Sequence, residues 1–146
     1  MTPALLALTF VLDAAPVCGA KSPEDALRRI EDAYRARDLE LAVACKDFER
    51  EAKAMLEHLA TGKSPASDAA LVRETAKTLE AAYRAEIKKT GFPDMKGVQC
   101  KVVRKEPGPK DLTTLTERCT WPDGQTSEDR VTVSSGPLGW RMVVTD

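Results

Sequence analysis

The chain has 146 residues, of which 22 are Lys or Arg and 23 are Asp or Glu, so its formal net charge is −1. This length suits one domain with a single core and is too short for two. Because charges of both signs are balanced and interspersed, nucleic acid and anionic membranes are excluded as expected partners.

The first predicted element is an export signal. Residues 4–12 (ALLALTFVL) form an apolar run of the length found in signal peptides, far short of the roughly 20 residues that a membrane-spanning helix needs. The small residues Cys18-Gly19-Ala20 offer a cleavage site before Lys21. No Lys or Arg precedes the apolar run, and a buried N-terminal helix is the alternative. We expect residues 1–20 to be a signal peptide and residues 21–146 to be one mature domain, periplasmic or secreted.

Cys18 is also a candidate for lipidation. Pro16 and Val17 precede it, where a lipidated cysteine usually follows small residues. We therefore expect no lipid anchor, and no contact with a membrane after cleavage.

Three helices are predicted next. The first begins at Ser22–Asp25, which supplies an N-cap, a Pro at the first helical position and the acidic residue of a capping box. Asp38 caps the second, which runs to Gly62, and the third runs from Ser64-Pro65 to Gly91. Their inward faces are predicted to hold Ala26, Leu27, Ile30, Ala33 and Tyr34, then Leu41, Cys45, Phe48, Ala52, Met55, Leu56 and Leu59, then Val72, Ala76, Leu79, Tyr83 and Ile87.

From Gly97 the hydrophobic period changes to two, which predicts an antiparallel meander of four strands. A three-residue turn at Pro122–Gly124 sets Trp121 opposite Gln125 and Leu115 opposite Val131. A two-residue turn would bury a row of Thr, Glu and Arg, because a one-residue slip exchanges the two faces of a strand. The resulting inward face carries Val98, Cys100, Leu115, Cys119, Val131, Trp140 and Met142.

The fold class is therefore α+β, with three N-terminal helices packed on a curved four-stranded meander. The passage AYRARDLELA at 33–42 and the closing strand GWRMV at 139–143 resemble the nuclear transport factor 2-like (NTF2-like, or SnoaL-like) superfamily, especially its small exported bacterial members of unknown function. The resemblance spans residues 22–145 and implies a cone-like shape, often with a pocket between sheet and helices. Superfamily members include isomerases, dehydratases, cyclases and non-enzymatic binding modules, and the fold does not choose among them.

Three cysteines remain after the predicted cleavage: Cys45, Cys100 and Cys119. A first hairpin closed by a six-residue loop would place Glu106 opposite Thr113 and Cys100 opposite Cys119, within disulfide reach. A bridge from Cys45 to either of these two is the alternative. The cysteine spacing and the single histidine, His58, do not fit a zinc site.

The same register places Glu117 directly opposite Asp129 on the inward face. Two carboxylates close together in apolar surroundings cannot both ionise easily, so one pKa should rise, as a general acid–base pair requires. The alternative is that both carboxylates are solvated at the rim of the sheet. Further pocket candidates are Tyr34, Tyr83, Trp140 and Met142.

No Ser/His/Asp set, phosphate-binding loop or dinucleotide fingerprint is present. We therefore expect an exported, non-catalytic domain that binds a small molecule or an envelope protein, without cofactor or metal. The alternative is a pocket enzyme of the isomerase or dehydratase kind that uses Glu117 and Asp129. Superfamily members often dimerise through the outer face of the sheet, but here that face carries Lys101, Arg118 and Arg130, which favours a monomer over a dimer.

Overall fold

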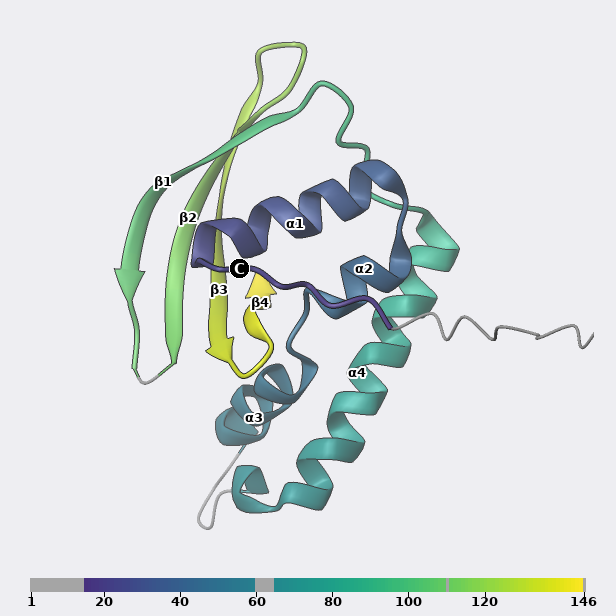
Figure 1. Ribbon diagram of the computed structural model, residues 1–146, viewed down its shortest axis with the longest axis vertical. Helices are drawn as coiled ribbons and strands as arrows, with labels where there is room; N and C mark the ends of the chain where they lie inside the picture. Colours follow the sequence, from purple (N-terminus) through teal and green to yellow (C-terminus); the bar gives the residue numbers. More distant parts are fainter. Residues whose placement is uncertain (1–14, 60–64, 110, 146) are drawn as a thin grey trace, which may run out of the picture.

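The computed structural model describes residues 15–59, 65–109 and 111–145 (Figure 1), so the apolar run at 4–12 lies outside the described residues. The helices come first and the strands second, which confirms the predicted α+β class. In chain order the elements are α1 (Pro23–Ala36), α2 (Leu39–Ala44), α3 (Phe48–Leu59), the 3₁₀ helix η1 (Pro65–Ser67), α4 (Ala69–Thr90), β1 (Gln99–Pro107), β2 (Leu112–Thr120), β3 (Thr126–Gly136) and β4 (Gly139–Thr145).

The four strands form one antiparallel sheet in the order β1-β2-β3-β4. α1 lies across its inner face, and α4 packs beside α2 and α3 on the side away from β1 (Figure 1). Leu115 pairs with Val131, as predicted, and the Trp121 backbone N–H donates to the Gln125 carbonyl over 2.8 Å. The three-residue turn therefore sets the register, and both paired residues are buried in the core with Leu27 and Ile30 of α1.

The first hairpin differs from the prediction at a β-bulge. Cys100 pairs with Cys119, but the register shifts between Val102 and Arg104, and beyond this point Glu106 pairs with Thr114 rather than with Thr113. The expected six-residue loop is therefore wrong. One extra residue in β1 bends the strand locally and displaces its later pairs by one position, which the alternating pattern did not reveal.

The second predicted helix is in fact two, α2 and α3, with a break at Cys45–Asp47. At the break the chain bonds to β4: the Met142 N–H donates to the Cys45 carbonyl, and the Asp47 N–H donates to the Met142 carbonyl, both over 2.8 Å. An Asp47 carboxylate oxygen also accepts the Arg50 N–H over 3.0 Å and caps α3. Backbone groups that a continuous helix would satisfy internally are satisfied here by the sheet.

The break also changes the buried face of α3. Phe48, Ala52 and Leu56, spaced by four residues, are buried, whereas Met55 is 43% and Leu59 70% exposed. The prediction that these last two residues face inward is wrong, because a new helix start after Asp47 rotates the later residues relative to those of α2. Gly91 caps the C-terminal end of α4, as predicted, but α4 begins at Ala69 after the Asp68 N-cap and not at Pro65.

All four cysteines are paired. Cys100 is joined to Cys119 across β1 and β2, and Cys45 is joined to Cys18, which lies inside the range expected to be signal peptide. No cysteine in the described ranges is free. Cys45 was expected either to remain unpaired or to bridge to the sheet, and both expectations are wrong.

Candidate functional site

A cavity of about 210 Å³ lies between α1 and the inner face of the sheet. This volume corresponds to roughly seven water molecules at about 30 Å³ each, so it suits a compact ligand. Most of its wall is apolar and comes from Leu27, Ile30, Val98, Val131 and Met142.

α1 presents one stripe of side chains to the cavity. Leu27, Ile30, Glu31 and Tyr34 all line it, and their spacing of three and four residues places them on one helical face. The start of the helix is fixed by Ser22, whose hydroxyl accepts the Asp25 N–H over 3.0 Å. Sequence reasoning missed Glu31 as a site residue. Its signal was present, since it occupies an inward position of the stripe that already held Ile30 and Tyr34.

Three carboxyl groups meet at the cavity. Glu117 and Asp129 pair directly across β2 and β3, as the register predicted, and both line the cavity together with Glu31. Glu117 is half-buried, whereas Asp129 is exposed at the rim. The alternative of solvated carboxylates therefore holds for Asp129 and not for Glu117.

Burial raises the pKa of Glu117 to about 8, and a hydrogen bond with Glu31, together with the nearby charges of Glu31 and Asp129, acts in the same direction. Arg35 opposes the shift. At neutral pH the Glu117 side chain therefore holds a proton. One carboxylate oxygen of Glu31, Oε1, is buried and accepts no bond from an N–H or O–H group in the described residues. The carboxyl proton of Glu117 is the donor that the Glu31 carboxylate lacks.

The predicted pocket residues divide into two pairs. Tyr34 and Met142 line the cavity, whereas Tyr83 and Trp140 are not among its lining residues. Tyr83 contributes indirectly, because its hydroxyl lies 2.8 Å from that of Tyr34 and the two form a hydrogen bond. Burial raises the pKa of both phenols, so both remain protonated.

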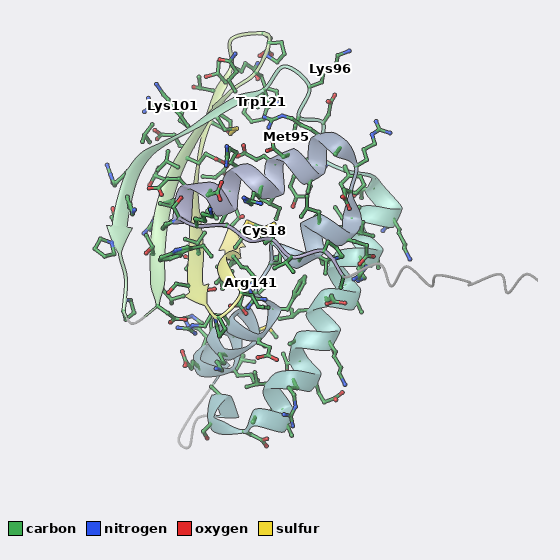
Figure 2. The ribbon with its side chains drawn as sticks, in the orientation of Figure 1. Cys18, Met95, Lys96, Lys101, Trp121 and Arg141 are labelled. Carbon is green, nitrogen blue, oxygen red and sulfur yellow. A yellow bond between two sulfur atoms is a disulfide. The ribbon has the colours of Figure 1, made fainter. Side chains whose placement is uncertain are left out.

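Two residues outside the predicted set also form part of the cavity wall. Met95 and Trp121 both line it, and Figure 2 shows them near each other above α1. Trp121 is 38% exposed, so part of this residue is accessible to solvent. A wall that includes Met and Trp favours an apolar or aromatic ligand.

The disulfide borders the carboxyl cluster. Cys119 Sγ lies 3.8 Å from Glu117 Oε1, and ligand atoms of Cys100, Glu117 and Cys119 all lie within 4.8 Å of one another. Such a group could suit a metal if its sulfurs were thiolates. Since both sulfurs belong to the disulfide, they offer no thiolate, and these residues do not fit a metal.

A larger groove of about 670 Å³ lies between α4 and the α2–α3 break. Several of its charged side chains form ion pairs with neighbouring carboxylates: Arg141 pairs with Asp47, Lys77 with Glu74, and Arg84 with Glu40 and Glu80. The groove is therefore a weaker candidate than the smaller cavity, which is lined by Glu117 with its raised pKa.

Neither the protein-family models nor the curated proteins include a match to this sequence. Among solved structures, the chain is similar to a Campylobacter jejuni protein described as an NTF2-like transpeptidase, with 13% identity, coverage of 85% of this chain and 99% of that one, and a TM-score of 0.45. It is also similar to an NTF2-like protein of unknown function from Shewanella oneidensis, with 13% identity, coverage of 82% and 90%, and a TM-score of 0.44.

A third similar structure is a phospholipid-binding protein from Ralstonia solanacearum in complex with a phospholipid, with 14% identity, coverage of 83% of this chain and 73% of that one, and a TM-score of 0.45. The NTF2-like name in the first two descriptions belongs to those two proteins. At this identity the likeness concerns the fold, and what those proteins bind is a property of those proteins.

Proposed function

We propose that this chain is an exported domain that binds a small organic molecule in the cavity between α1 and the sheet. One observation carries the proposal: a cavity of about 210 Å³ with apolar walls has a cluster of three carboxyl groups on one side. Small-molecule sites combine apolar walls with a few convergent polar groups in this way.

The side chains that line the cavity indicate the chemistry of its ligand. Leu27, Ile30 and Val131 favour an apolar body. Glu31, Glu117 and Asp129 favour a basic group, because an ammonium can donate hydrogen bonds to two carboxylates and take the place of the proton on Glu117. The ligand class is therefore a compact apolar amine.

Export is supported by the cysteine chemistry. Two disulfides, Cys18–Cys45 and Cys100–Cys119, form and persist in an extracellular or periplasmic environment and are rare in a reducing cytosol. None of the helices in the described ranges has the length and apolar character needed to cross a bilayer.

The proposal is tested with three matched probes: benzylamine, benzyl alcohol and benzoate, which share one ring and differ in charge. Binding is followed by calorimetry and by the shift in thermal unfolding. We expect benzylamine to bind most tightly and benzoate not to bind. Glu117→Gln should weaken the binding of benzylamine by about tenfold, the loss expected for one charge-assisted hydrogen bond.

Glu128→Gln is the control, since Glu128 is exposed on the other face of the sheet and pairs with Arg118. It should bind benzylamine like the natural chain. If none of the three probes shifts unfolding, the proposed ligand class is wrong. If all three bind equally and Glu117→Gln has no effect, the carboxyl cluster does not select the ligand.

A second candidate function is proton-transfer catalysis, and the raised pKa of Glu117 favours it. A carboxylic acid that is neutral near pH 7 can donate a proton, and Asp129 opposite it can accept one. A compact ketone incubated with the protein in D₂O should then exchange its α-hydrogens for deuterium. Exchange that persists unchanged in Glu117→Gln would rule out this role.

A further inference from the structure

Residues 15–20, here called the N-terminal strap, are part of the folded domain. In Figure 1 the strap is the purple segment that runs beside α1 into the start of that helix. Arg29 of α1 donates from Nη1 to the Cys18 carbonyl over 2.9 Å. Cys18 is 1% and Ala20 2% exposed, and both belong to the main core with Leu115 and Val133.

The disulfide fastens the strap to the interior. Cys18 and Cys45 are joined, and Cys45 is completely buried at the end of α2. Cys45 also accepts, through its carbonyl, the N–H of Met142 in β4. The bridge therefore links the strap to the point where the helices meet the sheet.

The start of β4 accommodates the strap. Ala20 forms an antiparallel bridge with Trp140, whose N–H donates to the Ala20 carbonyl over 3.1 Å. At the neighbouring position 139, a Cβ on Gly139 would lie 2.6 Å from the Ala20 oxygen, closer than any side chain tolerates. A glycine at this position lets the Ala20 backbone pass.

Cleavage after Ala20 would remove all of these contacts. Cys45 would be left as a buried, unpaired thiol, and the Trp140 N–H would lose its acceptor. We propose that the signal peptide is instead removed on the N-terminal side of Cys18, after Ala14 or Ala15, so that the strap and both disulfides belong to the mature protein. Ala14 or Ala15 supplies the small residue directly before the cut, whereas Leu12 or Asp13 occupies the other position where the pattern has a small residue. This inference rests on the proposed export and is independent of what the cavity binds.

The test uses the full chain with its own N-terminus, recovered from the periplasmic fraction of a Gram-negative host, unfolded in guanidinium chloride and alkylated with iodoacetamide without reduction. We expect an intact mass that begins at Ala15 or Pro16, four hydrogens below the reduced mass, with no alkylated cysteine. A mass that begins at Lys21 with one alkylated cysteine would overturn the inference while leaving export intact. A chain that keeps Met1 and stays in the cytoplasm would overturn the proposed export itself.

Two variants make the result independent of the mass assignment. If the inference is right, Cys18→Ser exposes Cys45 to alkylation once the protein is unfolded, and Cys45→Ser exposes Cys18. If Cys18 is removed with the signal peptide, Cys45→Ser leaves no alkylatable cysteine. The control is Cys100→Ser combined with Cys119→Ser, which should leave the Cys18–Cys45 bridge unalkylated.

Discussion

At the residue scale, Glu117 links the chemistry of the cavity to the stability of the fold. Its pKa is about 8 in the folded chain against an ordinary value of 4.5, so between these pH values the folded state holds a proton that the unfolded state has released. The contribution of Glu117 to stability is therefore full below pH 4.5 and falls as the pH rises toward 8, by at most about 1.4 kcal/mol per pH unit. Glu117→Gln should remove this loss.

This prediction is checked by urea unfolding of the natural chain and of Glu117→Gln at several pH values between 5 and 9. The free energy of unfolding of the variant should exceed that of the natural chain increasingly with pH. Glu128→Gln, on the exposed face, should follow the natural chain. Parallel curves for the natural chain and Glu117→Gln would show that Glu117 ionises as easily folded as unfolded.

A second residue-scale prediction concerns two glycines with nearly the same backbone. Gly124 and Gly139 have φ angles of +86° and +88°, so an alanine at either one meets a similar conformational penalty of about 1 kcal/mol. A Cβ at 124 meets nothing within 4 Å, whereas one at 139 meets the Ala20 oxygen at 2.6 Å. Gly139→Ala should therefore lower the free energy of unfolding by at least about 1 kcal/mol more than Gly124→Ala does.

Chemical denaturation of the two variants measures this difference directly. Equal losses would mean that the strap does not pass Gly139 in the mature protein, in agreement with cleavage after Ala20. The comparison therefore also bears on the position of the mature N-terminus, by a route that involves no cysteine.

At the scale of elements, Asp47 holds the junction between α3 and the sheet. It is buried, caps α3 through the Arg50 N–H, accepts the Ser134 hydroxyl over 2.7 Å and pairs with Arg141 at 3.2 Å. Asp47→Ala should cost about 3 kcal/mol, because it removes a cap and leaves a half-buried guanidinium without its carboxylate.

The matched control is Asp38→Ala. Asp38 caps α2 through the Leu41 N–H but is exposed, so its loss should cost only about 1 kcal/mol. Thermal and urea unfolding of both variants give the comparison. If the two caps cost the same, the bonds of Asp47 to Ser134 and Arg141 add nothing to the junction.

The same junction shows where sequence reasoning reached its limit. The β2–β3 register followed from local turn chemistry and alternation, and it correctly placed Glu117 opposite Asp129. The β1–β2 pair Cys100 and Cys119 was also predicted correctly, although the six-residue loop assumed for that hairpin was wrong. The break at Asp47 depends on hydrogen bonds to β4, which lies almost 100 residues later in the chain, and no helical periodicity encodes such a partner. The bulge in β1 lies where two adjacent valines, Val102 and Val103, interrupt the alternation of apolar and polar residues.

For the candidate site, too, the sequence predicted the contact between neighbouring strands but not the contact between the helix and the sheet. The pair Glu117 and Asp129 lies on neighbouring strands, so register alone brought the two together. Glu31 belongs to a helix, and its approach to Glu117 depends on how α1 crosses the sheet, which the sequence does not specify. Cys18 was missed because its apolar, small-residue surroundings also fit a cleavage site.

At the scale of the whole molecule, the two disulfides close separate stretches of chain, from 18 to 45 and from 100 to 119. Because the loops do not overlap, their effects on the unfolded chain should add. In the chain-entropy model each contributes about 3 kcal/mol, so both together contribute about 6 kcal/mol. That is comparable with the entire net stability of a small domain, about 5–15 kcal/mol.

We therefore predict that reduction of both bridges leaves the chain largely unfolded at 37 °C, whereas loss of either one alone leaves a folded domain with a lower unfolding temperature. Circular dichroism during heating, with and without a phosphine reductant, tests the first part, and the paired Ser variants at 18 and 45 or at 100 and 119 test the second. A reduced chain that still unfolds cooperatively within a few degrees of the oxidised one would show that the core alone stabilises the fold. If the reduced chain is unfolded and the oxidised chain is folded, the protein needs an oxidising compartment in order to fold. Export would then be a physical requirement of this sequence.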